Sequence, residues 1–383
     1  MISQAEILVH KTIFDASNAV PYHTGAFPPG DIDLARLIAP QTDAAIALTR
    51  YDTMLQALPN GELLLAPLRT RDAVVSSRME GTISTLEDVL RLEADAEDAG
   101  PSPDARDDTL EVALYARALR QSERQLSDGY PITEQLIRDA HATLLGFGRG
   151  AAKHPGDYKR EQNYIGDRRH RRIDFIPVSP EQLGPGMEQL IAYVRAPSDL
   201  PLIRTAIAHA EFEALHPFED GNGRLGRMLI TLMLWQGGVL RAPHFFVSDY
   251  FERNKDEYVD RLRAVSADGD WTGWCAFFLR ALAEQAATNI EVVGQIRAHH
   301  AEMRDRFRDL LRSRWSTDAL TWIFANPIFR NNRFKKNAGI PPATANNITN
   351  RLVEAGLLDT LIPASGRAPA LYAFPSLIDI IRD

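Results

Sequence analysis

Residues 216–227 read HPFEDGNGRLGR and are followed at once by an apolar run, MLITLMLW, at residues 228–235. The apolar run predicts a buried helix, and the glycines before it predict a sharp turn that opens this helix. A helix N-terminus presents free N–H groups and the positive end of the helix dipole, which together bind anions. This stretch therefore predicts a buried helix whose first turn binds a phosphate group.

The polar side chains of the same stretch suit the chemistry of a polyphosphate. His216 can be neutral near pH 7 and accept a proton, and Asp220 offers the hard oxygen ligands that Mg²⁺ prefers. Arg224 and Arg227 lie three residues apart, project to one side of the helix and can grip phosphate oxygens. A turn or a solvated helix face would explain each residue singly. No such explanation covers the whole segment, which therefore favours a polyphosphate site.

The segment matches the pattern HPFx(D/E)GNGRxxR at every specified position, and the chain resembles the Fic family over roughly residues 27–374. The resemblance implies a mostly helical fold and transfer of AMP from ATP to a hydroxyl group of a target protein. It implies that His216 is the base, that Phe218 anchors the loop in the core, and that Asp220 binds the Mg²⁺ between the α- and β-phosphates. The residues implied to line the anion hole and hold the phosphates are Gly221, Asn222, Gly223, Arg224 and Arg227.

A second stretch, PGDYKREQNYIG at residues 155–166, leads into a basic run at 168–172 and then into IDFIP at 173–177. The turn residues Gly166-Asp167 lie between two β-type segments and predict a hairpin with a basic tip. A solvated turn would explain the basic run equally well. In the Fic family this region is a flap that docks the backbone of the target, and Tyr164, Ile165 and Gly166 resemble its core. The family often has arginine at the position of Lys159.

Residues 76–81, SSRMEG, fit the inhibitory pattern of the family, (S/T)xxxE(G/N). Ser76 and Glu80 would be i, i+4 neighbours on one helix face, and Gly81 would end that helix. Without the resemblance, the pattern is weak and Glu80 would be an ordinary surface residue. With it, we expect Glu80 to pair with Arg227, to occupy the arginine meant for the γ-phosphate, and so to misalign ATP. The chain thus resembles the autoinhibited class whose inhibitory helix precedes the catalytic motif.

The composition narrows the class of protein. The net charge of −8 argues against a protein that coats nucleic acid as a whole. A single cysteine, Cys275, excludes an internal disulfide and points to a reducing compartment. Residues 1–20 contain no apolar signal region, and the longest apolar run is too short to cross a bilayer. We therefore expect a bacterial cytoplasmic protein with no membrane partner.

The chain changes character from residue 296 onward. There, 13 Lys and Arg face 8 Asp and Glu, a net charge of +5, which leaves −13 for the rest of the chain. Three helical patterns and two strand patterns follow in an order that resembles a winged helix. The recognition helix would carry Thr344, Asn347 and Arg351 on its polar face, with Arg367 at the wing tip. DNA binding is one interpretation; a protein contact, including a homodimer, is the one we favour. The helical patterns are 318–325, 333–338 and 343–355, and the strand patterns are 357–361 and 370–374.

Helical periodicity covers much of the remaining chain. The glycine-rich GFGRG at 146–150 follows a helix and not a strand, so we interpret it as a connector. For His209 we expect core packing; Tyr258 either walls the adenine pocket or packs in the core. The helical patterns are 42–58, 85–96, 109–126, 133–145, 180–195 and 201–215.

The sequence therefore predicts a mainly all-α protein with a β-hairpin flap and a C-terminal winged helix. The predicted domains are an N-terminal helical region with the inhibitory helix, 1–104, a Fic core, 105–290, and a winged-helix-like domain, 296–383. The predicted activity is autoinhibited protein adenylylation that uses ATP and Mg²⁺ and includes self-modification. One alternative is that the same site moves another group or removes AMP. The other is a DNA-binding regulator whose Fic domain senses nucleotide.

Overall fold

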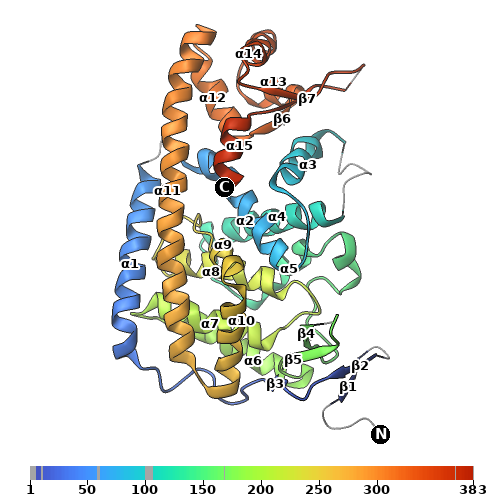
Figure 1. Ribbon diagram of the computed structural model, residues 1–383, viewed down its shortest axis with the longest axis vertical. Coiled ribbons are helices and arrows are strands. Elements are labelled where there is room, and N and C mark those ends of the chain that lie inside the picture. The colour runs from blue at the N-terminus through green and yellow to red at the C-terminus, as the bar shows by residue number, and fades with distance from the viewer. Residues whose placement is uncertain are drawn as a thin grey trace. The chain divides into compact units, whose positions relative to one another are not determined.

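The structure of the chain, a computed structural model, describes residues 6–9, 12–57, 61–99, 107–167, 169–366 and 368–382 (Figure 1). Most of them lie in helices, and the strands form one five-stranded and one three-stranded sheet. The predicted mainly helical fold is thereby confirmed. The chain divides into two compact units, Met1–Thr49 with Arg117–Gln285, and Arg50–Ala116 with Ala286–Asp383. Within the described ranges, no helix combines the length and the apolar character that crossing a membrane requires.

The central helix of the first unit is α7 (Pro201–Leu215), of whose 15 residues 12 are buried. A helix that is apolar on every side belongs in a protein core, and a proline at its first position has the helical φ already set. For these reasons α7 begins and ends at the residues that the sequence predicts. Other helices of this unit are α5 (Glu134–Leu144), the short 3₁₀ helix η1 (Gly148–Ala152), α6 (Pro180–Arg195), α8 (Asn222–Gln236), α9 (Ser248–Arg253) and α10 (Lys255–Asp268).

An aromatic cluster packs against α7 and includes the start of α11 (Trp271–Leu311). The Trp274 side chain is fully buried and donates its Nε1–H to the carbonyl of Ala206 at 2.7 Å. The His209 imidazole is buried in the same cluster, in ring contact with Phe251 and Trp274. The expected core-packing role of His209 is confirmed.

The predicted hairpin is formed by β4 (Ile165–Asp167) and β5 (Arg172–Ile176), which pair antiparallel. Its described turn residues, 169–171, belong to the predicted basic tip, whereas Gly166 and Asp167 lie in β4 and not in the turn. Asp167 instead ends its strand and shapes the turn, because its Oδ1 accepts the backbone N–H groups of Arg169 and His170 at 2.8 and 3.1 Å. Arg168, part of the predicted basic tip, lies outside the described residues.

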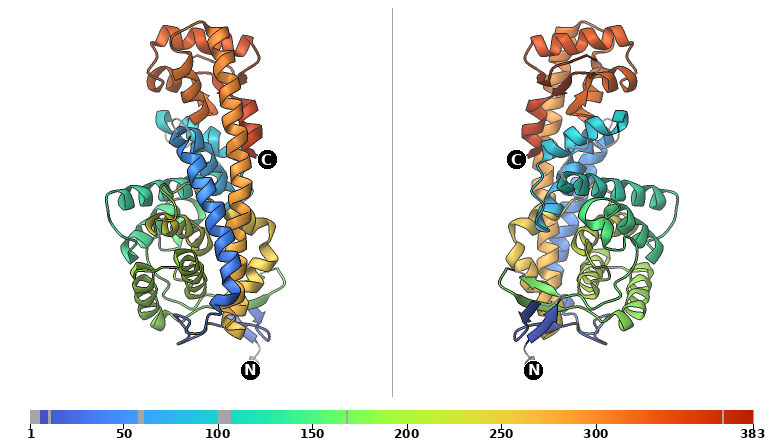
Figure 2. Two further views of the ribbon diagram at one scale, coloured as in Figure 1. Left: turned by 90° about the vertical axis from the view of Figure 1, so that its left-hand side faces the viewer. Right: turned by 90° about the vertical axis from the view of Figure 1, so that its right-hand side faces the viewer.

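Three N-terminal strands, which the sequence analysis did not predict, extend the hairpin into a sheet: β1 (Glu6–Val9), β2 (Thr12–Asp15) and β3 (Val20–Pro21). β1 pairs antiparallel with β2, while β2 and β3 both run parallel to β5. β2 and β3 pair with the edge of β5 opposite to β4. Arg172 of β5 accordingly lies between Asp15 of β2 and Asp167 of β4. The dark blue strands lie beside the green hairpin in Figure 1 and in both views of Figure 2.

The second unit contains α2 (Gly61–Met79), α3 (Leu86–Ala99), and the start of α4 (Asp107–Ser127). Thr85 and Asp88 exchange hydrogen bonds at the start of α3: the Thr85 hydroxyl accepts the Asp88 N–H at 3.2 Å, and the Asp88 carboxylate accepts the Thr85 N–H at 3.1 Å. This reciprocal capping explains why the helix begins where it does. The long helix α11 is continuous through residues 290–296, and the predicted three-domain division stays a prediction.

The C-terminal part of the second unit has the element order of a winged helix, as predicted. The structure adds a short first strand and a final helix, and β8 lies between β6 and β7. The elements are α12 (Ser316–Ala325), β6 (Ile328–Arg330), α13 (Asn331–Asn337), α14 (Pro342–Glu354), β7 (Asp359–Ile362), β8 (Leu371–Ala373) and α15 (Pro375–Arg382).

Arg351 does not take its predicted place on a DNA-reading face of α14. Its guanidinium donates to the backbone carbonyls of Leu310 and Leu311. These carbonyls belong to the C-terminal end of α11, where the helix dipole attracts a cation. Asn347 is exposed and Thr344 is half-buried, and Arg367 lies outside the described residues. Arg351 is therefore bound within its own unit, and the choice between protein contact and DNA binding stays a prediction.

Candidate active site

His216 lies at the point where α7 ends. Its backbone adopts φ 46° and ψ 61°, a left-handed conformation that costs a residue other than glycine about 1–3 kcal/mol. Pro217 forces the helix to end here, because a residue that precedes proline avoids the right-handed helical region. The C-terminal end of α7 carries a partial negative charge, which stabilises an imidazole that has accepted a proton. Both the position and the electrostatics suit a base.

Phe218 anchors the following loop. Its side chain is fully buried, and its ring stacks on His141 with centroids 3.7 Å apart and an interplanar angle of 12°. Tyr158 covers it at a centroid distance of 5.3 Å. The anchoring role expected for Phe218 is confirmed.

The side chain of Asn222 closes the loop. Its Oδ1 accepts the N–H of Phe218 at 2.9 Å and its Nδ2 donates to the carbonyl of the same residue at 2.8 Å. Gly221, at φ 78°, makes the turn into α8, and a Cβ there would lie 3.2 Å from Leu144 Cδ2. The side-chain amide of Asn222 therefore holds the loop, so its contribution to an anion hole would come from its backbone N–H.

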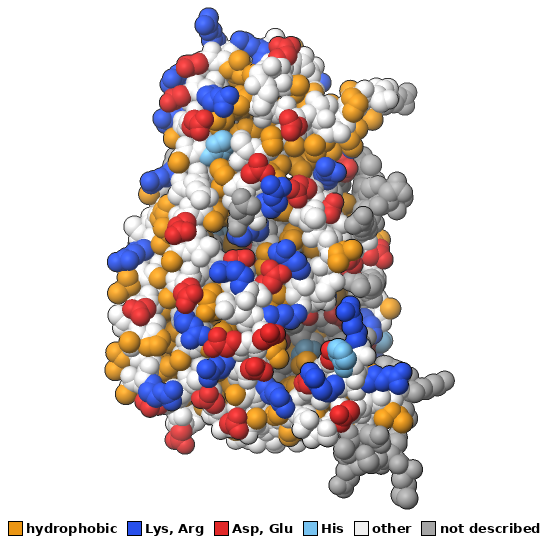
Figure 3. Space-filling view, viewed as in Figure 1, with side chains coloured by type: hydrophobic (Ala, Val, Ile, Leu, Met, Phe, Trp, Pro, Cys, Tyr) orange, Lys and Arg blue, Asp and Glu red, His pale blue; other side chains and the backbone are white. Residues whose placement is uncertain are grey.

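The first turn of α8 is a potential anion site. Asn222 is its first residue, and the first N–H groups of a helix have no partner within the helix. Arg224 lies in this first turn and Arg227 in the second. Both arginines are buried, with 3% and 4% of their surface exposed. Arg224 Nη2 lies 3.3 Å from Asp220 Oδ1, and the Asp220 side chain is 47% exposed. On the face drawn in Figure 3, basic and acidic side chains are mixed, and neither charge dominates.

Asp220 fits a metal ion that arrives with a nucleotide. The described residues hold no cluster of three or more His, Cys, Asp or Glu side chains that could bind a metal by themselves. Mg²⁺ is usually held by one or two carboxylates together with substrate phosphates, and not by a cage of protein ligands. A half-exposed carboxylate beside a helix N-terminus has this character.

The flap residues lie next to the loop in the structure. Asn163, immediately before Tyr164, donates its Nδ2 to the carbonyls of His216 and Phe218 at 3.1 and 3.0 Å. Gly166 must be glycine, since a Cβ there would lie 2.1 Å from the carbonyl oxygen of Arg172. Ile165 faces Phe175 across the hairpin. Tyr164, Ile165 and Gly166 are thus held close to the histidine that the sequence singles out.

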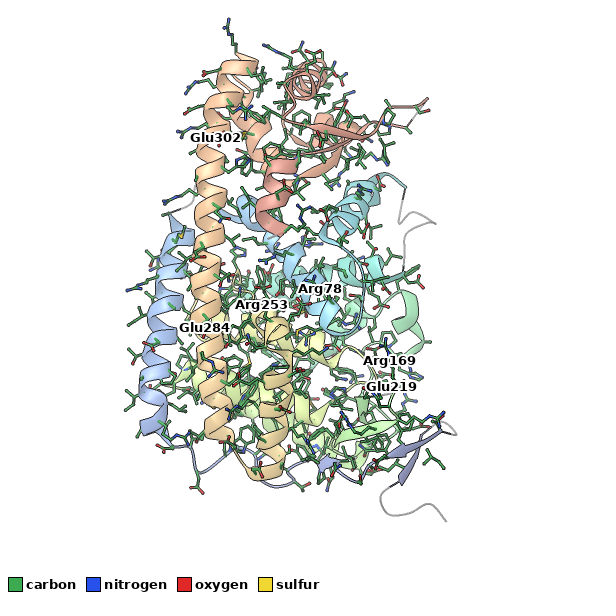
Figure 4. All side chains as sticks on the ribbon, in the orientation of Figure 1. Arg78, Arg169, Glu219, Arg253, Glu284 and Glu302 are labelled. Atoms are coloured by element: carbon green, nitrogen blue, oxygen red, sulfur yellow. The ribbon has the colours of Figure 1, made fainter. Side chains whose placement is uncertain are left out.

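Glu219, labelled in Figure 4, borders the loop on its exposed side. Its carboxylate lies 3.0 Å from His154 Nδ1 and 3.9 Å from Lys153 Nζ. These contacts tie the motif loop to the segment that follows η1. The GFGRG stretch that supplies η1 is a connector, as predicted.

His141 is a residue of the site that the sequence analysis missed. Its ring is buried, its Nδ1 accepts the N–H of Gly156 at 2.8 Å, and its Nε2 donates to the carbonyl of Asp220 at 3.0 Å. Burial lowers the pKa of His141 to about 4, so the ring is neutral. It stands 79 residues before Asp220, and no local pattern in one sequence connects two such positions.

Tyr258 lies in the aromatic cluster. It is 5% exposed, stacks on Phe251 at a centroid distance of 4.6 Å, and its hydroxyl lies 2.9 Å from His209 Nε2. The surrounding side chains cover its ring. This arrangement is the core packing named as the alternative to an adenine contact.

Ser76, Glu80 and Gly81 belong to the second unit. The Ser76 side chain is fully buried in α2, which ends at Met79, one residue beyond Arg78, labelled in Figure 4. Glu80 is exposed and lies in the turn that follows, with its N–H bonded to the carbonyl of Ser77 at 3.0 Å. Gly81, at φ 95°, completes this turn. Glu80 thus directly follows the last residue of α2, and its inhibitory role stays a prediction.

Two segments of the chain match known families. Residues 131–234 match the Fic/DOC family, and residues 38–123 match the Fic/DOC family N-terminal region. Protein adenylyltransferase fic-1 of Caenorhabditis elegans is 32% identical over 105 residues, which are 27% of this chain and 19% of that protein. Protein adenylyltransferase Fic of Drosophila melanogaster is 28% identical over 142 residues, 36% of this chain and 26% of that protein. The chain thus matches about a fifth to a quarter of the length of these curated relatives.

Solved structures share the fold. A Fic family protein from Desulfovibrio desulfuricans superposes with a TM-score of 0.58 at 22% identity, covering 91% of this chain and 98% of that one. Fic-1 of C. elegans gives a TM-score of 0.53 at 22% identity, covering 72% of this chain and 80% of the other.

Proposed function

The chain belongs to the Fic/DOC family and carries the N-terminal region of that family, and on this premise we propose that it is a protein adenylyltransferase. It would transfer AMP from ATP to a hydroxyl side chain of a target protein. The observation that carries the proposal is the loop 216–221, which places His216 at the end of one buried helix and a free helix N-terminus at the start of the next. A base and an anion site thus lie on one short, well-anchored loop.

In the proposed reaction His216 removes the proton from the hydroxyl of the target. The hydroxyl oxygen forms a bond to the α-phosphorus of ATP, the bond from this phosphorus to the bridging α–β oxygen breaks, and pyrophosphate leaves with the bond electrons. The proton stays on the imidazole, where the C-terminal end of α7 stabilises the positive charge. Base catalysis of this kind contributes about 10²–10⁴-fold to a rate.

The phosphates of ATP would be held at the start of α8. The backbone N–H groups of Asn222 and Gly223 would form the anion hole, together with that of Gly221, which donates to Asp220 Oδ1 at 2.6 Å in the structure and would have to exchange this partner for a phosphate oxygen. Arg224 and Arg227 would bind the β- and γ-phosphates. Asp220 would hold Mg²⁺, which neutralises charge on the α- and β-phosphates when bound. Arg224 contacts Asp220 and keeps this carboxylate oriented at the mouth of the site.

The target would dock at the flap. Tyr164 and Ile165 follow directly on the residue that binds the catalytic loop, so a backbone paired with β4 would lie close to His216. Residues of the chain itself are expected among the targets.

We also propose that Glu80 inhibits the reaction by pairing with Arg227. The support is the match of residues 76–81 to the inhibitory pattern together with the position of Glu80 in an exposed turn behind a buried helix. A tethered carboxylate has a high effective concentration at its partner, so it competes well with a diffusing γ-phosphate. Removing it would allow the γ-phosphate to bind Arg227 and the α-phosphate to align with the hydroxyl.

The test is incubation of the wild type, Glu80→Gly, and Glu80→Gly with His216→Ala, with α-labelled ATP and a cell lysate. We expect strong labelling by Glu80→Gly, weak labelling by the wild type and none by the double variant. Mass spectrometry of the labelled side chain identifies the group that was transferred, so a mass other than that of AMP would refute adenylylation. Equal rates for the first two proteins would refute the inhibitory role of Glu80, and full labelling by a folded double variant would refute the role of His216.

A further inference from the structure

Two residues outside the motif bind the backbone on both sides of His216. Lys159 donates its backbone N–H to the carbonyl of Pro217 at 2.8 Å, and its Nζ to the carbonyl of Leu215 at 3.0 Å. Asn163 donates its Nδ2 to the carbonyls of His216 and Phe218 at 3.1 and 3.0 Å. Four successive carbonyls, from Leu215 to Phe218, are therefore bound by two residues.

The two residues are also bound to each other. The Lys159 Nζ donates to Asn163 Oδ1 at 2.8 Å, which directs the amide oxygen toward the lysine and the amide N–H groups toward the loop. The two hydrogens of Nδ2 are then used by two carbonyls. The pair thus forms one hydrogen-bonded unit, in which both N–H groups of the Asn163 amide donate to loop carbonyls.

The Lys159 ammonium is in an unusual environment for a lysine. Only 4% of the residue is exposed, and both acceptors of its Nζ are neutral oxygens. Burial lowers its pKa to about 7. Leu215 is the last residue of α7, where the negative end of the helix dipole stabilises a nearby cation. A buried cationic group costs free energy unless hydrogen bonds compensate, and the bonds of the Lys159 Nζ go to the loop and to Asn163.

The left-handed backbone of His216 needs support of this kind. A conformation disfavoured for a residue other than glycine persists only where the surrounding structure determines it. The hydrogen bonds of Lys159 and Asn163 hold the carbonyls directly before, at and after this residue.

We propose that Lys159 and Asn163 are positioning residues of the transfer reaction. They hold His216 in its left-handed conformation and fix its distance to the flap, because Asn163 is followed immediately by Tyr164 and Ile165. Neither residue contacts the reacting groups; both act through the backbone of His216. The expected effect on the transfer rate rests on the proposed adenylyl transfer. The expected effect on the conformation of the loop rests on the hydrogen bonds alone.

The test compares Lys159→Met, Asn163→Asp and Lys159→Arg in the Glu80→Gly background. Methionine keeps the length of lysine and removes the donor, and aspartate keeps the size of asparagine and removes both N–H groups. Arginine keeps a long cationic donor. Arg160→Met is the matched control, because Arg160 is an exposed cation of the same segment, bound at 3.4 Å to Asp157 and not to the loop.

Three quantities are measured: the rate of AMP transfer at saturating ATP, the dissociation constant of ATP, and hydrogen exchange of the peptide spanning residues 212–224. A loop displaced by about 1 Å lowers a rate by about 10²-fold. We expect Lys159→Met and Asn163→Asp to lower the rate by about 10–100-fold, to leave the ATP dissociation constant within about threefold, and to speed exchange of the peptide. Lys159→Arg should restore the rate to within about tenfold of the parent, and Arg160→Met should change nothing.

Parent-like rates and exchange in Lys159→Met and Asn163→Asp would overturn the proposal. So would a parallel loss of ATP binding, which would place these residues in nucleotide recognition. If one variant does not fold by circular dichroism, the other decides the question. If no protein of the set transfers AMP, the proposed function fails, and the exchange measurement still decides whether the two residues hold the loop.

Discussion

The buried His209 makes a specific prediction about stability in acid. Its Nδ1 lies 3.2 Å from the carbonyl of Gly226, which can only accept, and its Nε2 lies 2.9 Å from the Tyr258 hydroxyl. The ring therefore carries its proton on Nδ1 and is neutral. Burial, followed by the charge of Arg227, lowers the pKa of His209 from 6.5 to about 3.

The sign of the effect follows from this depressed pKa. In the unfolded chain this histidine takes up a proton as the pH falls below 6.5. In the folded chain it stays neutral until the pH reaches about 3. The stability that His209 contributes is therefore present above pH 6.5 and is lost as the pH falls toward 3. At about pH 5 the loss amounts to about 2 kcal/mol.

The measurement is urea unfolding of the wild type and of His209→Gln at about pH 8 and about pH 5, followed by tryptophan fluorescence. The Trp274 ring lies 5.9 Å from the His209 ring, so its emission reports on this core. Glutamine can donate and accept at the same site but does not titrate. Between about pH 8 and about pH 5 the free energy of unfolding should fall for both proteins. We expect the fall to be about 2 kcal/mol smaller for His209→Gln than for the wild type.

A matched control separates titration from packing. Phe251→Leu removes part of a fully buried ring in the same cluster and introduces no titratable group. It should lower stability by the same amount at both pH values. If the curves of wild type and His209→Gln run parallel from about pH 8 to about pH 5, the reasoning from the buried neutral imidazole is refuted.

Three further predictions concern the loop and the flap. Phe218→Ala should lower the free energy of unfolding by about 3–5 kcal/mol in urea titrations, because a fully buried ring is removed from its stack; a loss below about 1 kcal/mol would contradict this. Gly166→Ala should slow transfer to a protein target by about tenfold or more with ATP affinity unchanged in calorimetry, because a Cβ would lie 2.1 Å from the carbonyl oxygen of Arg172; an unchanged rate would show that the hairpin geometry is not needed. In Asp220→Ala, Mg²⁺ should no longer strengthen ATP binding in the same calorimetric assay, and a retained Mg²⁺ effect would place the metal ligand elsewhere.

Some interpretations depended on neighbours that the sequence does not reveal. Tyr258 lies on a helix with polar residues, yet its ring is covered by Phe251 and its hydroxyl bonds to His209. Arg351 lies on the polar side of α14, yet its guanidinium binds carbonyls at the end of α11. In both cases the periodicity of the helix is compatible with a side chain that is open to a ligand and with one that is engaged by another segment of the protein. Only the packing of a distant segment decides between them.

Local signals were sufficient for the helices around the site and for the motif itself. Pro201 and the apolar residues after it determine where α7 begins, and the run from Pro217 to Gly221 determines where it ends, since these signals act within a few residues. Residues 216–227 are contiguous, so their relative placement follows from one turn and the start of one helix. The flap was predicted for the same reason, because several turn-forming and basic residues occur together.

Only the tertiary structure decided what holds this loop and what completes the sheet. β1, β2 and β3 contain four residues or fewer each, and β2 and β3 pair with a strand about 150 residues later in the chain. His141, Lys159 and Asn163 reach the loop through backbone carbonyls, which every residue possesses. A carbonyl leaves no mark in the sequence, and a pairing between distant segments has no period along the chain. The sequence therefore determined the chemistry of the loop, and the long-range hydrogen bonds determined its shape.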